Sequence, residues 1–169
     1  MGRYINSNEA VWRILRFPIH DRYTTVVHLS VHLENCRRVY FTSDNAHERA
    51  TQPQDTTLTA YFKLCQEDTF AETLLYAENP KYYTWNKSKK SFCRRKQCTV
   101  FPGHSNVFDS DALRRVYTVH PNNAECFNLS LLLHTIREPT SFTDLKTVGG
   151  QVCETYREAC IKLGLLEDD

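Results

Sequence analysis

The segment from Lys81 to Lys96, KYYTWNKSKKSFCRRK, combines cationic and aromatic side chains. It holds 7 Lys and Arg and no Asp or Glu, whereas residues 1–80 hold 8 against 10 and residues 97–169 hold 6 against 10. Cations pair with phosphates and aromatic rings stack on bases, which together dominate sequence-tolerant binding of single-stranded nucleic acid. We therefore predict a nucleic-acid contact formed by Lys81, Tyr82, Trp85, Lys87, Lys89, Lys90, Arg94, Arg95 and Lys96.

The local pattern predicts that this segment is a β-hairpin. Aromatic residues precede a polar turn at 86–89, and Phe92 follows it. Because side chains alternate between the two faces of a strand, some of the aromatic rings must face the core. The alternative interpretation is that Tyr83, Trp85 and Phe92 all pack inward and the lysines only solvate an exposed turn.

Catalytic motifs for nucleotide hydrolysis or strand cleavage are not found in the sequence. A phosphate-binding P-loop requires a glycine followed by Lys and a hydroxyl residue, and none of the five glycines precedes a Lys. A metal-dependent nuclease of the rolling-circle type requires two histidines that flank one apolar residue, and no two of the seven histidines are two apart. We expect no enzymatic activity from this chain alone, and no cofactor.

Two sets of side chains could be considered for metal binding. His28 and His32 would suit zinc on a helix, but on a strand they lie about 13 Å apart, too far to share one ion. A four-ligand set could be drawn from Cys93, Cys98 and His104 with His120 or Cys126, yet its spacing departs from known zinc motifs. We favour histidines bonded to solvent or neighbours, incidental thiols, and no metal.

Composition indicates one compact protein of ordinary solubility. The chain has 169 residues, of which 41% are hydrophobic and 24% are charged, enough to bury a core. No apolar stretch approaches the roughly 20 residues of a membrane span, and MGRYINSNEA contains no apolar signal region. Seven cysteines without a CxxC pair do not indicate a disulfide framework. The expectation is an intracellular soluble protein with reduced thiols.

The first half of the chain predicts helices and strands that lie close together in the sequence. A capping box at Asn6 and Glu9 predicts a helix to Phe17, and alternation from Thr25 to Leu33 predicts a strand that pairs with 38–41. Polar residues 42–57 predict a loop. The next helix is expected over 58–76, interrupted near Asp68 and stopped by Asn79-Pro80. Its core positions would be Leu58, Ala60, Tyr61, Leu64, Ala71, Leu74 and Leu75.

The second half predicts a turn-rich loop at 101–110, a short strand at 116–119 and a helix after Asn122-Asn123. The expected inward side of that helix is formed by Phe127, Leu131, Leu132 and Ile136. Near the C-terminus, Thr140 or Ser141 would cap a short turn that contains Phe142 and Leu145.

The C-terminal region ends with clear turn and cap signals. Gly149-Gly150 predicts a hairpin turn. Thr155 and Glu158 predict a capping box for a helix over 156–163, which would bury Ala159, Cys160 and Leu163 before Gly164 at C′. The expected fold is α+β, a small mixed domain with short antiparallel hairpins and about four to six short helices. A connecting domain at 1–136 would precede a small helical subdomain at 137–169.

Longer stretches of the sequence resemble the connecting region of Helitron-type rolling-circle transposon proteins. The similarity is carried by RYINSNEAVWRILRFPIHDRYTTVVHLSVHLENCRRVYF (3–41), LTAYF (58–62), LLYAENPKYYTWNKSKKSFCRRK (74–96) and PTSFTDLKTVGGQVCETYREACIKLGLLEDD (139–169). In that family a replication-initiator nuclease lies upstream and an ATP-dependent DNA helicase lies downstream. The resemblance implies that this chain corresponds to the stretch between the two catalytic units.

The resemblance also implies partners and a location. DNA, in particular single-stranded DNA, would be the ligand, the helicase domain of a full-length relative a possible partner, and the nucleus the location. The chain departs from the family at NNAECFNLSLLLHTI (122–136), where relatives show a Gly-Glu-Arg-like start followed by aromatics and an arginine, and at Cys36, where relatives have Gly. Two alternatives therefore stay open: a protein-interaction module that docks onto a helicase, and an inactive transposon relic.

Overall fold

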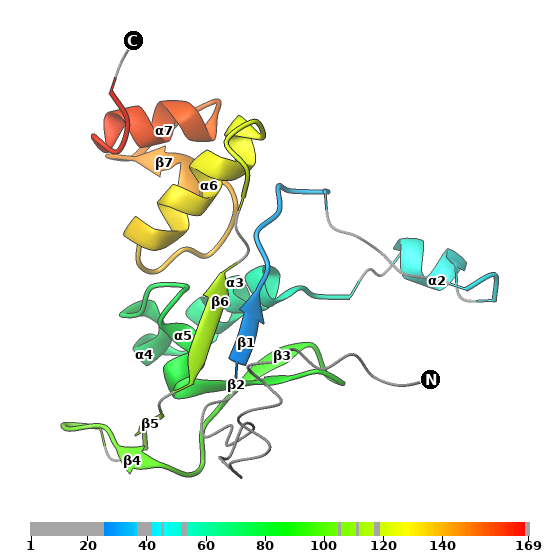
Figure 1. The fold of residues 1–169 in the computed structure, drawn as a ribbon, viewed down its shortest axis with the longest axis vertical. Coiled ribbons are helices and arrows are strands. Elements are labelled where there is room, and N and C mark those ends of the chain that lie inside the picture. The colour runs from blue at the N-terminus through cyan, green and yellow to red at the C-terminus, as the bar shows by residue number, and fades with distance from the viewer. Residues whose placement is uncertain are drawn as a thin grey trace, which may run out of the picture.

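The computed structural model describes residues 26–36, 42–44, 46–51, 54–104, 106–110, 112–116 and 119–167. The helix predicted at 6–17 and the strand predicted at 38–41 lie outside these residues. Short helices and short antiparallel hairpins make the described part a small α+β fold, which confirms the predicted class (Figure 1).

The longest-range strand pairing joins β1 (Val26–Leu29) to β6 (Leu113–Val116). The two strands are parallel, and Leu29 lies opposite Val116. Val27 and Leu29 are buried while Val26 and His28 are exposed, so the predicted alternation is confirmed over these four residues. The strand predicted to continue to Leu33 ends at Leu29, and residues 30–33 are half-buried without alternation. The predicted pairing of this strand with 38–41 lies outside the described residues. Among the described residues β1 pairs with the distant β6, and the strand expected at 116–119 ends at Val116.

The helix predicted over 58–76 is confirmed up to Glu72, with its interruption at Asp68, whereas residues 73–76 are not helical. Thr56 caps α3 (Thr57–Glu67) in a reciprocal capping box with Thr59. The backbone N–H of Asp68 donates to Leu64 and ends α3, and its carboxylate accepts the Phe70 N–H at 3.0 Å and begins α4 (Thr69–Glu72). The predicted core side chains are buried, apart from the half-buried Leu64 and Leu75.

Two expectations about the flanks of this helix were wrong. The polar region 42–57 contains a short helix, α2 (Ala46–Thr51). Asn79-Pro80 does not stop a helix but begins α5 (Asn79–Tyr82). Proline is tolerated in the first turn because its missing N–H has no intrahelical partner there.

Three antiparallel hairpins follow. The first pairs β2 (Tyr83–Asn86) with β3 (Ser91–Arg94), as predicted. The second, β4 (Thr99–Val100) with β5 (Phe108–Asp109), lies partly in the region expected to be only a loop. The third pairs β7 (Thr147–Val148) with β8 (Gln151–Val152) around the predicted glycine turn, where both glycines have positive φ.

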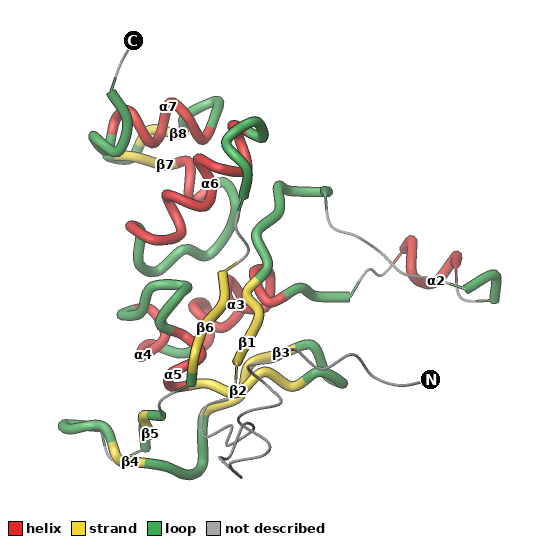
Figure 2. Tube along the Cα trace, viewed as in Figure 1, coloured by secondary structure: helices red, strands yellow, loops and turns green. Residues whose placement is uncertain are grey.

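The helix α6 (Ala124–Thr135) buries a different side from the predicted one. Leu129 and Leu133 are fully buried beside Leu132, whereas Phe127, Leu131 and Ile136 are half-buried. The reason is tertiary. The helix packs against α7 (Tyr156–Lys162) and the 3-10 turn η1 (Asp144–Lys146), so the side facing these elements is covered (Figures 1 and 2). This packing crosses the predicted domain boundary at 136.

The C-terminal caps agree with the sequence, with two exceptions. Thr155 Oγ1 accepts the Glu158 N–H at 3.1 Å, but Glu158 Oε2 accepts from Glu154 rather than from Thr155. Gly164, with φ +68°, closes a Schellman motif in which the N–H of Leu165 donates to Cys160. Leu163 was expected to be buried but is 39% exposed, because it lies just past the last helical residue.

Two properties concern the described chain as a whole. Its buried apolar side chains, apart from Ala77 and Cys126, form one continuous cluster from β1 to α7. None of the described helices has the length and apolar character needed to cross a membrane.

Candidate nucleic-acid interface

The turn between β2 and β3 is held by its own side chains. Asn86 Oδ1 accepts the backbone N–H of Ser88 and of Lys89, both at 3.0 Å. Lys90 adopts a left-handed conformation with φ +51° and leads into β3. Asn side chains stabilise turns in this way because they take the place of a backbone acceptor. The three lysines at 87, 89 and 90 are therefore presented on an ordered four-residue turn.

The aromatic residues of the hairpin divide between core and surface. Tyr83 and Phe92 are buried, and Tyr82 packs edge-to-face on Phe70 and Phe101 at centroid distances of 5.1 and 5.4 Å. Tyr82 was predicted to contact nucleic acid, but its burial leaves no free ring face in this conformation. Trp85 is half-buried against its cross-strand neighbour Phe92, at a centroid distance of 5.0 Å. Trp85 is therefore the aromatic ring of this hairpin that remains partly accessible.

Arg94, a predicted contact residue, is bound to Asp68. Its Nε donates to Oδ2 and its Nη2 to Oδ1, both at 2.6 Å, and Tyr83 donates its hydroxyl to Oδ2 at 2.8 Å. The hydrogen bonds from Arg94 hold the pKa of Asp68 below its ordinary value, and burial raises the pKa of Tyr83. These contacts fasten the base of the hairpin to the junction between α3 and α4. Arg94 therefore has a structural role.

Lys81 and Arg95 also make structural contacts. Lys81 Nζ lies 3.0 Å from Asp109 Oδ2, and this hydrogen bond raises the pKa of the lysine. Arg95 is half-buried and donates to the backbone carbonyls of Lys81 at 3.1 Å and Pro80 at 2.8 Å. The guanidinium thus satisfies carbonyl groups at the end of α5.

Four of the predicted cations remain available. Lys87, Lys89 and Lys96 are exposed and Lys90 is half-buried. Within the described ranges, no carboxylate forms a salt bridge with any of them. Of the nine predicted residues, the structure thus brings four lysines and Trp85 to one accessible hairpin, and it uses Lys81, Tyr82, Arg94 and Arg95 in packing.

The histidines and cysteines considered for metal binding make different contacts. His32 bonds Thr56 Oγ1 through Nε2 at 2.8 Å and the Leu33 carbonyl through Nδ1 at 2.9 Å, so it is bonded to neighbours as favoured. Cys93 and Cys98 are exposed, whereas Cys126 is buried beside the Val31 carbonyl. Among the residues with described positions, no three His, Cys, Asp or Glu side chains are grouped to hold a metal ion.

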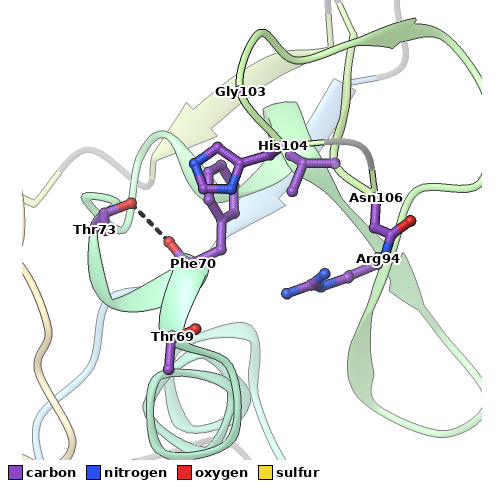
Figure 3. A pocket seen from close by; sticks show the side chains of 8 residues that line it. Thr69, Phe70, Thr73, Arg94, Gly103, His104 and Asn106 are labelled. Atoms are coloured by element: carbon purple, nitrogen blue, oxygen red, sulfur yellow. Dashed lines mark hydrogen bonds between the residues drawn. The ribbon is translucent and has the colours of Figure 1, made fainter.

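A pocket of about 320 Å³ lies beside the base of the hairpin (Figure 3). Arg94 forms one wall, Phe70 and Thr73 of the α4 region form another, and His104 and Asn106 come from the loop between β4 and β5. Sequence reasoning missed this site because its residues come from three separated segments. The one local signal was the density of aromatic residues and histidine around Phe101 and His104.

No protein-family model matches this chain, and no curated protein is significantly similar to it.

Proposed function

We propose that this chain is a noncatalytic single-stranded DNA-binding module of a Helitron-like transposon helicase protein, acting in the nucleus in DNA replication and recombination. The observation that carries the proposal is the ordered turn that presents Lys87, Lys89 and Lys90 without acidic partners in the described part of the chain. Lys96, two residues past the end of β3, adds a fourth cation, which is exposed.

These lysines predict a measurable salt dependence of binding. Each phosphate neutralised on a single strand contributes roughly −0.7 to the slope of log K against log salt concentration. Four lysines therefore predict a slope of about −3. Arg94 and Lys81 are left out of this predicted slope, because they form ion pairs with Asp68 at 2.6 Å and Asp109 at 3.0 Å.

Trp85 supports a preference for single strands. Its ring lies on the same hairpin as the four lysines, half-buried against Phe92. Unpaired bases expose a face that can stack on such a ring, whereas bases within a duplex do not. A module of this kind between a nuclease and a helicase would guide the strand that both enzymes handle.

The protein-docking alternative would be favoured by a continuous exposed apolar patch. Among the described residues, the large apolar side chains that are exposed lie on four separate elements: Val26, Val100, Val152 and Leu163. Single apolar residues scattered on a surface are normal. The distribution therefore favours the DNA-binding proposal over protein docking. Cooperative thermal unfolding of the purified chain would argue against the relic alternative.

Fluorescence anisotropy with labelled single- and double-stranded oligonucleotides tests the proposal across a salt titration. We expect tighter binding to single strands, with a slope of about −3 in log K against log salt concentration. The combined exchange of Lys87, Lys89, Lys90 and Lys96 for Glu is expected to abolish binding and its salt dependence.

The choice of variant follows from the structure. A charge reversal at Lys89, Lys90, Arg94 and Arg95 looks natural from the sequence, but it would also disrupt the contacts of Arg94 with Asp68 and of Arg95 with backbone carbonyls. A control variant exchanges Lys63, Lys146 and Lys162, the three lysines outside residues 81–96, for Glu. Circular dichroism verifies that it is folded, because Lys63 and Lys162 pair with Asp55 and Glu158. Unchanged affinity in the hairpin variant, or equal loss in the control, would sink the proposal.

A further inference from the structure

The pocket beside the hairpin has an aromatic side. His104 is exposed and stacks on Phe101, with centroids 5.9 Å apart and an angle of 30° between the planes. Phe70 lies 5.2 Å from the same imidazole. The histidine therefore ends a small aromatic stack with a ring that reaches the pocket (Figure 3).

The loop that carries His104 is held in place by backbone hydrogen bonds. The N–H of His104 donates to Phe101, and the N–H of Val107 donates to the carbonyl of His104, each at 3.1 Å. Phe101 also donates to Val107 at 2.8 Å, which closes the base of the loop. Gly103 permits the turn through its φ of +85°. The ring is thus supported before any ligand arrives.

The opposite side of the pocket is polar. Arg94 and Asn106 lie there, and Thr69 lies at the edge (Figure 3). The ion pair with Asp68 uses the Nε and one Nη2 hydrogen of Arg94, so other guanidinium N–H groups can still donate. Asn106 is exposed and carries both a donor and an acceptor. Because the charge of Arg94 is largely balanced by Asp68, the pocket suits a neutral planar group with hydrogen-bonding edges better than an isolated anion.

We propose that this pocket holds one unstacked base of a single-stranded nucleic acid. The base stacks on His104 and directs its polar edge to Asn106 and Arg94. This inference rests on the proposed function and adds a second contact to it. The pocket volume of about 320 Å³ falls within the range of about 300–1,000 Å³ that is usual for small-ligand sites.

The distance along the hairpin makes the two contacts compatible with one strand. Lys90, the last residue of the turn, and Arg94, the last residue of β3, are four residues apart, which corresponds to about 13 Å of extended chain. Stacked nucleotides advance about 3.4 Å each, so about four nucleotides span this interval. One strand of a dozen nucleotides can therefore contact the lysine turn and place a base in the pocket.

A pair of probes separates base stacking from phosphate contacts. Anisotropy is measured for the full chain with labelled dT12 and with a twelve-unit abasic strand that carries the same phosphates. His104→Ala is expected to weaken dT12 binding at least about fivefold without changing the salt slope. The abasic strand should bind wild type and variant equally, and His104→Phe should restore dT12 binding because it keeps a stacking ring.

His47→Ala is the matched control, since His47 is an exposed histidine on α2 and does not line this pocket. Circular dichroism verifies that each variant is folded. The inference is overturned if His104→Ala binds dT12 like wild type, or if it loses the same affinity for the abasic strand. The charge-reversed turn variant distinguishes the two proposals. If the charge-reversed variant loses binding while His104→Ala does not, the proposed function stands and the base-binding role of the pocket is refuted. If the wild-type chain binds neither strand, both proposals are refuted.

Discussion

Arg94 and Asp68 form a two-pronged ion pair, with Nε and Nη2 of the arginine each 2.6 Å from a carboxylate oxygen. The pair joins the end of β3 to the residue that ends α3 and begins α4. The same carboxylate accepts the hydroxyl of Tyr83, which lies opposite Arg94 in the hairpin. The position of the proposed DNA-binding hairpin therefore depends on one acidic side chain.

Removal of the arginine should destabilise the fold measurably. Arg94→Ala is expected to lower the free energy of unfolding by about 1 kcal/mol, because Asp68, whose side chain is 12% exposed, loses two donors. Lys63→Ala is the control, since Lys63 pairs with Asp55 at the same 2.6 Å but is 62% exposed, and pairs in water contribute little. Urea denaturation measures both variants. Equal losses would contradict the structural role of Arg94.

The Asp68 carboxylate also predicts a pH dependence. Its pKa in the folded state is below the ordinary 3.8, so the unfolded chain binds the proton more tightly. The resulting stability is complete well above pH 4 and is lost as the pH falls through the folded-state pKa. The difference in unfolding free energy between wild type and Asp68→Asn should therefore shrink from pH 7 to pH 3. Urea titrations at these pH values measure the difference, and a constant difference would refute the assignment.

The Tyr76 hydroxyl should contribute to stability because it links two distant segments. It is fully buried and bonds the Ser30 carbonyl and Thr57 Oγ1, each at 2.9 Å. Tyr76→Phe is expected to cost about 1–2 kcal/mol, since the buried Thr57 hydroxyl and the half-buried Ser30 carbonyl both lose this partner. Tyr156→Phe is the control, because Tyr156 is also buried but its hydroxyl has no hydrogen bond to the described residues. Thermal and urea unfolding should show a larger loss of stability for Tyr76→Phe than for Tyr156→Phe. Similar losses in the two variants would argue against the link.

Gly164 should be intolerant of a side chain because of its backbone conformation. Its φ of +68° is left-handed, and an added Cβ would meet no neighbouring atom within 4 Å. Gly164→Ala is therefore expected to cost about 1 kcal/mol through backbone strain alone. Leu163→Ala, one residue earlier and at a partly exposed position, should cost less. Thermal unfolding of both variants measures which one is less stable. An unchanged stability of Gly164→Ala would show that the helix end relaxes to accommodate the side chain.

Features that depend on neighbours in the sequence could be predicted. The helix interruption at Asp68, the hairpin at 83–94, the glycine turn at 149–150 and the Schellman end at Gly164 are all observed. In each case the stabilising contact lies within a few residues, so the amino-acid types alone carry the information. The lysines of the 87–90 turn belong to this group, because Asn86 orders the turn locally.

Features that depend on distant segments were decided only by the tertiary structure. β1 pairs with β6, more than eighty residues away. No local sequence pattern specifies which strand forms hydrogen bonds with the backbone of β1. The inward side of α6 is set by α7 and η1. In the candidate site, Arg94 faces Asp68, and His104 packs beside Phe70 on the aromatic side of the pocket. The sequence by itself determined where the cations lie along the chain, while packing determined which of them remain free, because a charge is neutralised only by the group that folding brings beside it.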